Sequence, residues 1–395
     1  MNPNILRTEV QDFIKSNLNT EISAMIFKGS PFPEITVQEL ANQIIAKGKS
    51  VKKLPTWFHQ NNIYFPQKIS IEQTSSEITA LYKSELVEGN SLIDLSGGFG
   101  VDTYYFSKKI KKVTHCEINK DLSKIVGHNF KQLETNNVTL INEDGIQYLK
   151  DNDVTYDYIY IDPSRRDATK NKVFLLKDCT PNVPETLDIL FSKSENIIIK
   201  TSPILDITST INELSCTKEI HIVAVNNEVK ELLFVLKKGF TDNIRIKTIN
   251  ILKDKKQEFQ FEISNEQSLH KEYAFPKKYL YEPNAAILKS GGFHEIPQIF
   301  ELQKLHEHTH LYTSDNLIDD FPGRKFQIEK IMPYNKKQLL KYLPEKKANI
   351  TVRNFPKTVA QIRKETKIKD GGEIYIFFTK LQDNSKVLII NNKIN

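Results

Sequence analysis

The sequence contains few cysteines, no long apolar run and no export signal. Its 395 residues include three cysteines, Cys116, Cys179 and Cys216, whose wide spacing fits neither a disulfide framework nor a C-x-x-C metal site. No stretch approaches the roughly 18 consecutive apolar residues of a membrane-spanning helix, and the first residues lack a charged-then-apolar export pattern. We therefore expect a cytoplasmic protein with buried thiols and no membrane association.

The length and composition indicate a globular protein of two or three domains. Apolar residues make up 39% of the chain and charged residues 26%, which suffices for buried cores and argues against wholesale disorder. A chain of 395 residues is too long for one ordinary hydrophobic core. A single fold for the whole chain is therefore disfavoured.

Positive charge is concentrated toward the C-terminus. The net charge of the chain is +6, but residues 1–240 carry −2 and residues 241–395 carry +8. Within the second part, residues 324–369 hold 14 basic and 3 acidic side chains. This stretch is the candidate surface for an anionic partner.

The first 88 or so residues show the spacing of short helices. Apolar side chains recur at helical intervals at Val10, Phe13, Ile14 and Leu18. The patterns Thr36-x-x-Glu39 and Thr74-x-x-Glu77 are typical of capping boxes at helix N-termini. We therefore expect helices to begin after Thr36 and Thr74.

The segment after residue 88 alternates short apolar runs with helix-length connections. The candidate strands are 92–95, 112–117, 138–142, 156–162, 196–201, 219–225 and 232–237. Five strands separated by crossover helices predict a parallel sheet. The last two are only six residues apart (226–231), so they are expected to form an antiparallel hairpin at the sheet edge.

The rest of the chain reads as a second hairpin and a mixed α/β tail. The hairpin is expected at 247–252 and 258–263, and the tail around 281–292, 326–332, 349–353 and 374–378.

A glycine-rich turn follows the first candidate strand. The segment Leu-Ile-Asp-Leu-Ser-Gly-Gly-Phe-Gly (92–100) runs directly into a helical pattern. Gly97, Gly98 and Gly100 let the backbone approach a ligand closely, and the following helix start presents free amides. A glycine turn with an acidic residue about twenty positions on suits a dinucleotide or S-adenosylmethionine (SAM).

Three features favour SAM. Asp94 lies in the turn, where its carboxylate would repel a pyrophosphate but can accept a hydrogen bond from a methionine ammonium. Thr103 occupies the last glycine position of the dinucleotide pattern G-x-G-x-x-G. Glu117 ends the second strand, where it can accept from both ribose hydroxyls, and Asp144 follows the third, where it can meet the adenine amino group.

These residues resemble the class I SAM-dependent methyltransferases over about residues 75–237. The resemblance implies an α/β fold with a doubly wound, seven-stranded sheet and a reversed edge hairpin. It also implies that SAM is held by Asp94, Ser96, Gly97, Gly98, Gly100, Glu117 and Asp144. Ser96 departs from the family pattern, which usually has its first glycine there.

A second motif ends the fourth strand. The sequence Asp162-Pro163-Ser164-Arg165 lies at the sheet edge where ligands of doubly wound folds collect. It resembles the Asp-Pro-Pro-Tyr motif of enzymes that methylate exocyclic base nitrogens, which implies that Asp162 and Pro163 accept from the acceptor amine. The stacking ring of that motif is absent here, and Arg165 with Arg166 can instead clamp phosphate or stack on a base.

Two other acceptors leave different traces in the sequence. Attack from a pyrimidine C5 needs a cysteine nucleophile, and Cys179 lies about 17 residues beyond the fourth strand. Transfer to a ribose 2′-oxygen uses a Lys-Asp-Lys-Glu set. Candidates for that set are Asp162, Lys200, Glu228 and either Lys68 or Lys83. Because SAM is an activated donor, alignment is the main requirement, and no base is assigned.

The C-terminal part resembles the THUMP-like domain fused to a bacterial branch of class I methyltransferases. The match runs over roughly residues 275–395 and is carried by 279–293, 311–315 and 352–356. THUMP domains proper bind RNA, which agrees with the basic stretch 324–369. Candidate contacts are Arg324, Lys325, Lys336, Lys337, Lys346, Lys347, Arg353, Arg363 and Lys364. Nearby aromatic side chains are expected in the core: Phe326, Tyr334, Tyr342 and Phe355.

Alternating histidines raise the question of a metal site. A single strand would place His306, His308 and His310 on one face. No cysteine, aspartate or glutamate cluster completes a tetrahedral set with them, so we expect no metal.

Together these patterns predict a SAM-dependent RNA methyltransferase acting on a base or ribose of rRNA or tRNA. The alternatives are a methyltransferase of proteins or small molecules and a non-catalytic, SAM-sensing RNA-binding protein. The expected domains are a helical domain (1–74), a methyltransferase domain (75–240), a linker hairpin with a ferredoxin-like segment (241–322) and a basic THUMP-like domain (323–395).

Overall fold

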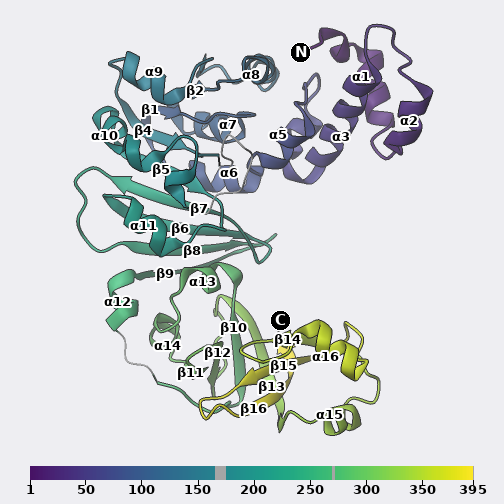
Figure 1. The fold of residues 1–395 in the computed structure, drawn as a ribbon, viewed down its shortest axis with the longest axis vertical. Coiled ribbons are helices and arrows are strands. Elements are labelled where there is room, and N and C mark those ends of the chain that lie inside the picture. Colours follow the sequence, from purple (N-terminus) through teal and green to yellow (C-terminus); the bar gives the residue numbers. More distant parts are fainter. Residues whose placement is uncertain (165–174, 269–271, 395) are drawn as a thin grey trace. The chain divides into compact units, whose positions relative to one another are not determined.

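The structure is a computed structural model that describes residues 1–164, 175–268 and 272–394 (Figure 1). The chain divides into two units, Met1–Thr217 with Leu233–Thr241 and Lys218–Leu232 with Asp242–Asn395. Among the described residues, none of the helices combines the length and the hydropathy that a membrane span requires. The domain boundaries at residues 74, 240 and 322 stay a prediction.

Short helices form the N-terminal part of the first unit (purple in Figure 1). They are η1 (Pro3–Leu6), α1 (Thr8–Ser16), α2 (Ile22–Lys28), α3 (Val37–Lys53), α4 (Pro55–His59), α5 (Lys68–Gln73) and α6 (Glu77–Ser84). The capping box that begins α3 is confirmed, because Thr36 accepts from the Glu39 amide at 3.2 Å and Glu39 accepts from the Thr36 amide at 2.9 Å. The helices share a core around Trp57, whose side chain is fully buried.

The second predicted capping box was wrong. Ser76, not Thr74, caps α6, and it accepts from the Thr79 amide. Glu77 cannot serve the cap because its carboxylate has tertiary partners: it accepts from the Thr56 hydroxyl and from the Tyr105 hydroxyl, both at 2.7 Å. These contacts connect α6 to α4 and to the helix that follows the glycine turn.

The first sheet contains all seven strands predicted between residues 92 and 237. They are β1 (Gly89–Asp94), β2 (Ile110–Cys116), β3 (Val138–Ile141), β4 (Tyr156–Ile161), β5 (Ser194–Thr201), β6 (Thr217–Val225) and β7 (Glu228–Lys237). β1 to β5 are parallel, in the order β3-β2-β1-β4-β5. The connecting helices are α7 (Val101–Ser107), α8 (Lys120–Gln132), α9 (Gly145–Asp151), α10 (Val183–Lys193) with η2 (Leu176–Asp178) before it, and α11 (Ile207–Glu213).

The edge position predicted for the β6–β7 hairpin was wrong, because two more strands follow it. The order continues β5-β7-β6-β8-β9, so the sheet has nine strands. β8 (Arg245–Ile251) pairs in parallel with β6, and β9 (Lys256–Glu262) pairs antiparallel with β8. The predicted linker hairpin therefore continues the first sheet, since β8 satisfies the backbone groups that β6 would otherwise expose at an edge.

The turn between β6 and β7 is shorter than predicted. Asn226 and Asn227 have φ angles of 50° and 64°. Two consecutive left-handed residues form a two-residue hairpin turn of type I′, in which asparagine is favoured. β7 consequently begins at Glu228, within the stretch 226–231 that the sequence pattern assigns to the connection.

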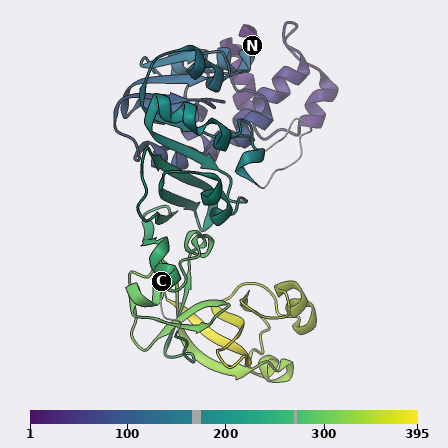
Figure 2. The same cartoon turned by 60° about the vertical axis from the view of Figure 1, so that its left-hand side comes forward.

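The second sheet, drawn in green and yellow in Figure 2, has seven strands. Its order is β11-β12-β10-β13-β16-β15-β14. The strands are β10 (Tyr279–Pro283), β11 (Gln303–His306), β12 (Thr309–Ser314), β13 (Gly323–Pro333), β14 (Asn349–Val352), β15 (Ile374–Lys380) and β16 (Lys386–Ile394). The helices of this part are α12 (Ile263–Ser268), α13 (Ala285–Ser290), α14 (Glu295–Phe300), α15 (Lys336–Tyr342) and α16 (Val359–Thr366).

Pairing of β10 with β13 joins the segments on either side of residue 322 into one sheet. The two strands run antiparallel, with Tyr279 opposite Gln327 and Pro283 opposite Gly323. Glu282 of β10 is 3% exposed and accepts from Arg324 at 2.6 Å. Hydrogen bonds and a buried charge therefore bind the predicted ferredoxin-like and THUMP-like segments to each other.

Of the C-terminal aromatic side chains expected in the core, one is fully buried and three are half-buried against it. Phe326 is fully buried, and Tyr334, Tyr342 and Phe355 pack against the cluster around Phe378.

The three histidines do not share one strand face. His306 ends β11, His308 lies in the turn, and His310 belongs to β12. No metal-binding group of three or more ligands was found among the described residues. The expected single strand was wrong because a tight hairpin interrupts the alternation.

Candidate active site

The glycine loop between β1 and α7 combines left-handed backbone with close packing. Gly98 and Gly100 have φ angles of 55° and 79°, which favour glycine. A Cβ atom added at Gly97 would lie 1.8 Å from Nδ1 of His115, which is on β2 directly below the loop. At Gly98 an added Cβ would meet the Ser96 carbonyl oxygen at 3.7 Å, an ordinary van der Waals contact, so the left-handed φ and not a clash favours glycine here.

Ser96 connects the loop to the motif that follows β4. Its hydroxyl accepts a hydrogen bond from the Asp162 amide at 2.6 Å and donates to Asp94 at 3.3 Å. The family glycine at this position has no side chain for these bonds. The departure of Ser96 from the pattern therefore has a structural function.

Asp94 lies beneath the loop rather than on its surface. Its side chain is 1% exposed and accepts from the Thr103 hydroxyl at 2.7 Å and from the Ser96 amide at 3.0 Å. Burial raises the pKa of Asp94 to about 7. The Asp94 carboxylate, which is predicted to accept from the methionine ammonium, therefore also holds the loop and the start of α7 through hydrogen bonds.

Glu117 reaches from the end of β2 to the glycine loop. Its carboxylate accepts from the Gly98 amide at 3.0 Å and from the Asn119 amide at 2.7 Å. Burial raises the pKa of Glu117. Asn142 fixes this corner by donating to the Glu117 carbonyl at 2.7 Å. Glu117 is therefore hydrogen-bonded directly to the glycine loop.

Ile118 is a candidate site residue that the sequence reasoning missed. Its side chain is 72% exposed immediately after Glu117. Next to Glu117, which is predicted to accept from ribose hydroxyls, an exposed isoleucine can offer an apolar contact to a purine ring. The sequence feature that could have indicated Ile118 is its position directly after Glu117.

Asp144 caps α9. One carboxylate oxygen accepts from the Ile146 and Gln147 amides at 3.0 and 2.9 Å. The residue is exposed at the strand end where the sequence placed it. Since the cap uses Oδ1, Oδ2 is the oxygen that an adenine amino group would meet.

Asp162 and Lys200 form an ion pair at the ends of β4 and β5. Their side chains are 33% and 14% exposed. Pro163 is buried next to Asp162. Ser164 pairs with Thr180 through two backbone hydrogen bonds of 2.7 and 2.9 Å, so the chain returns to the motif that follows β4. Arg165 and Arg166 lie outside the described residues.

A buried ion pair lies behind this edge. Lys83 of α6 is fully buried, and its ammonium lies 3.1 Å from Asp102 of α7. Asp102 also accepts from the Ser75 and Tyr160 hydroxyls, both at 2.8 Å. Burial disfavours the charge of Asp102, but Lys83 and Lys200 outweigh it and lower the pKa of Asp102.

Within the first unit, the structure brings together two members of the predicted Lys-Asp-Lys-Glu set. Asp162 and Lys200 pair, and Lys83 is the nearer candidate for the first lysine because its partner Asp102 interacts with Lys200. Lys68 is more than half exposed and lies 4.0 Å from Glu72. Glu228 belongs to the second unit and pairs with Lys230 at 2.6 Å.

The cysteines agree largely with the expectation of buried thiols. Cys116 and Cys179 are buried, whereas Cys216 is half-buried. Burial raises the pKa of Cys116 to about 12, and the Cys179 thiol donates to the Leu175 carbonyl at 3.6 Å. A nucleophilic role for Cys179 stays a prediction.

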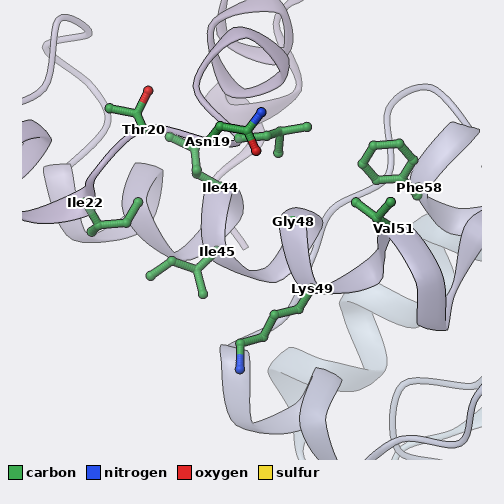
Figure 3. Close-up of a pocket in the computed structure, with 10 residues that line it drawn as sticks. Asn19, Thr20, Ile22, Ile44, Ile45, Gly48, Lys49, Val51 and Phe58 are labelled. Atoms are coloured by element: carbon green, nitrogen blue, oxygen red, sulfur yellow. The ribbon is translucent and has the colours of Figure 1, made fainter. Parts of the chain in front are cut away.

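A separate groove of about 500 Å³ lies among the N-terminal helices (Figure 3). Ile22, Ile45 and Val51 line it together with Lys49. Lys49 forms an ion pair with Glu72. Apolar side chains therefore form most of the lining of this groove.

Comparison with known proteins identifies the family. A family model described as ribosomal RNA adenine dimethylase matches residues 58–186, a ferredoxin-like domain matches 279–322, and a THUMP domain-like model matches 323–393. A crystal structure of a "putative methyltransferase" from Porphyromonas gingivalis W83 is 32% identical, with a TM-score of 0.89 over 99% of this chain and 98% of that one. The chain belongs to the SAM-dependent methyltransferases with C-terminal ferredoxin-like and THUMP-like domains.

A second relative of this methyltransferase is described as an RNA methyltransferase. An uncharacterized RNA methyltransferase from Mycoplasma mobile is 28% identical over 153 residues, or 38% of this chain. The chain spans 42% of the length of that relative.

The described residues fit SAM, the methyl donor of the family. Glu117 can accept from ribose hydroxyls, Ile118 can contact the purine, and Asp144 can accept from its amino group.

Replacing Ser96 with alanine in this methyltransferase is expected to lower kcat by about tenfold with little change in the Kd for SAM. The substitution removes the acceptor of the Asp162 amide, a loss of about 1 kcal/mol that also misplaces the Asp162 carboxylate. Calorimetry and single-turnover transfer measure the two constants. Ser192→Ala, which removes a hydroxyl bonded to the Ile189 carbonyl, is the control. Equal losses in kcat and SAM affinity would contradict the assignment.

Proposed function

We propose that this methyltransferase transfers a methyl group from SAM to a base or ribose of RNA at an acceptor held by Asp162 and Pro163. The observation that carries the proposal is the Ser96 hydroxyl, which connects the cofactor loop to the first residue of the acceptor motif at 2.6 Å. Methyl transfer requires donor and acceptor to be aligned within contact distance. The Ser96 bond supports such an alignment.

The cofactor side consists of the glycine loop and the acidic ends of β2 and β3. Glu117 would exchange its bond to the Gly98 amide for the ribose hydroxyls, Ile118 would cover the purine, and Asp144 would accept from the amino group. When bound, SAM supplies an activated methyl group on sulfur. The chain's own task is to bind, orient and desolvate the two reacting partners.

On the acceptor side, Lys200 orients Asp162. The ammonium of Lys200 contacts one carboxylate oxygen of Asp162. The second oxygen can accept a hydrogen bond from an N–H or O–H group of the acceptor, as can the Pro163 carbonyl. This orients the acceptor lone pair toward the methyl group. Arg165 and Arg166 remain the proposed phosphate contacts.

RNA as the substrate class is supported by the match to a ribosomal RNA methylase model and by the basic C-terminal domain. The structure divides the predicted cations into two groups. Arg324 and Arg353 both pair with the buried Glu282, at 2.6 and 2.7 Å. Arg363 donates to the Ile368 carbonyl and pairs with Asp370. These arginines therefore serve the fold.

The exposed lysines are better placed to meet a nucleic acid. The lysine corner, defined as Lys346, Lys347, Lys367 and Lys369, consists of exposed residues. The Lys369 amide donates to the Lys346 carbonyl at 2.7 Å, and Lys347 and Lys369 form a parallel bridge. No ion pair of these four side chains to a described residue was found. We propose this corner as the main phosphate contact.

Replacing the four lysines of the corner with glutamine is expected to weaken RNA binding and to reduce the slope of log K against log salt by about three. Each phosphate contact contributes roughly 0.7 to that slope for single strands. A filter-binding titration from 50 to 300 mM salt measures it. The control is Lys253→Gln with Lys255→Gln, two exposed lysines of the β8–β9 turn. An unchanged slope in the corner variant would exclude this surface.

The function itself is tested by mass spectrometry of RNA nucleosides. A deletion strain is expected to lack one methylated nucleoside, and the wild-type gene is expected to restore it. A gene encoding Asp162→Asn is expected not to restore it, although the purified variant still binds SAM. A complete set of modified nucleosides in the deletion strain would overturn the assignment to RNA.

A further inference from the structure

The groove among the N-terminal helices combines an aromatic ring with polar side chains (Figure 3). Phe58 and Val51 lie on one side of it, and Asn19 and Thr20 lie on the other. Its volume of about 500 Å³ is within the range of small-molecule sites, roughly 300–1,000 Å³. An unpaired base needs an apolar surface to stack on and amide or hydroxyl groups at its edge. The groove offers both.

Positive charge is in excess on α3, the helix that lines much of this groove. Residues 46–53 hold four lysines and no acidic residue. Of the acids on the neighbouring helices, Glu72 pairs with Lys49, and Glu21 lies at the N-cap of α2. Lys52 is exposed, and no ion pair of Lys52 was found in the part of the chain that the structure describes. The rim of the groove is therefore complementary in charge to a phosphate backbone.

Lys47, in the same lysine-rich stretch, is buried without a partner. It is 2% exposed, and its ammonium has no hydrogen-bond partner among the described residues. Its Nζ lies 5.8 Å from the ring centroid of Phe58 and 5.7 Å from that of Phe65. Lysine is rarely buried unless it is paired. Burial lowers the pKa of Lys47, and the ammonium of Lys15 on α1 lowers it further. An anion at the groove would favour the charged form of Lys47.

α4 connects the groove to the cofactor loop. Trp57 packs against Phe99 of the glycine loop with ring centroids 6.2 Å apart, and the next residue, Phe58, lines the groove. All of these residues belong to the first unit. The groove and the loop are thus separated by one short helix, so that they can hold different nucleotides of one strand.

We propose that the groove binds a base of the RNA substrate, stacked on Phe58, with the adjoining phosphates attracted by Lys47 and Lys52. The inference rests on the proposed function, since it adds a second contact for the same RNA. Aromatic rings beside clustered lysines are the usual surface for single-stranded nucleic acid. An apolar peptide could fill the groove but would bring no negative charge to compensate Lys47. The groove therefore anchors the strand beside the cofactor loop, independently of the lysine corner.

Photo-crosslinking of the full-length protein locates the base. The probe is a short oligouridine that carries 5-iodouridine, which on irradiation forms bonds with aromatic side chains stacked on the base. Mass spectrometry of the digested protein is expected to find a crosslink at Phe58. Crosslinks confined to the second unit would overturn the inference and leave RNA binding intact. A protein that binds no RNA at all would overturn the proposed function as well.

Two matched variants measure the stacking contact by fluorescence anisotropy with labelled oligouridine. Phe58→Leu keeps an apolar side chain but removes the ring, and it is expected to weaken binding about tenfold. Phe32→Leu makes the same change at a half-buried phenylalanine that does not line the groove. It is expected to leave binding unchanged. Unchanged binding in Phe58→Leu, as expected for a groove that takes a protein partner, would contradict the proposal, and so would equal losses in both variants.

Lys47→Met separates a role in binding from a role in the fold. Removing a buried cation that has no partner relieves its desolvation, so the melting temperature is expected to rise. The affinity for oligouridine is nevertheless expected to fall about fivefold, because the low dielectric around Lys47 strengthens its attraction to phosphate. Thermal unfolding and anisotropy measure the two effects. A lower melting temperature with unchanged RNA affinity would assign Lys47 to the fold and overturn its proposed role.

Discussion

Gly97→Ala is expected to lower the affinity for SAM by about ten- to a hundredfold. The added Cβ would lie 1.8 Å from Nδ1 of His115, a distance that forces the loop or the ring to move. His115 is 1% exposed and packs near Phe130 with ring centroids 6.1 Å apart, so it has little room. Overpacking of this kind costs about 1–3 kcal/mol. Calorimetric titration with SAM measures the loss.

A second substitution separates this clash from a general loss of stability. His115→Ala in the Gly97→Ala background removes the ring and is expected to restore most of the SAM affinity. The control is Gly48→Ala in α3, where the nearest atom to the new Cβ is 3.8 Å away. It is expected to leave SAM binding unchanged. Wild-type affinity in Gly97→Ala alone would contradict the proposed contact.

Lys83→Met is expected to lower the free energy of unfolding by about 3–5 kcal/mol. The ammonium lies 3.1 Å from Asp102 and 3.0 Å from the Ser75 hydroxyl, and the side chain is fully buried. Its removal leaves the Asp102 carboxylate buried with one cation fewer, and breaking a buried ion pair from one side has a cost of this size. Urea denaturation monitored by circular dichroism measures it.

The coupling between the two partners is the decisive control. In the double variant Lys83→Met with Asp102→Asn, part of the stability is expected to return, because no uncompensated charge remains. Lys237→Met removes one partner of an exposed pair with Glu195, whose side chains are 40% and 70% exposed. That change is expected to cost less than about 1 kcal/mol. Additive losses in the double variant would show that Lys83 and Asp102 do not interact.

Sequence patterns predicted the strands and the ligand-bearing edge of the first sheet well. Apolar runs separated by helix-length connections determine parallel pairing, and all seven strands between residues 92 and 237 are present. The glycines at 97, 98 and 100 could also be interpreted from the sequence, because each has a steric or conformational reason. These features depend on local spacing, which a sequence displays directly.

Features that depend on distant partners could not be predicted. Nothing in the spacing of apolar residues indicated that β8 would pair with β6, because spacing does not show which strands become neighbours. The burial of Asp94 depends on Thr103 and Ser96, and the buried lysine of α6 depends on Asp102. Arg324 and Arg353 looked like RNA contacts in the sequence because their common partner, Glu282, lies about 40 and about 70 residues before them.

The pairing of β10 with β13 limits how the C-terminal half can be dissected or recombined. A fragment that began at Gly323 would leave β13 with unpaired amides and carbonyls along the residues that now face β10. Such an open strand invites self-association, and Arg324 and Arg353 would lose their common carboxylate. The two modules should therefore be inherited and exchanged as a pair, and soluble fragments should start before Tyr279.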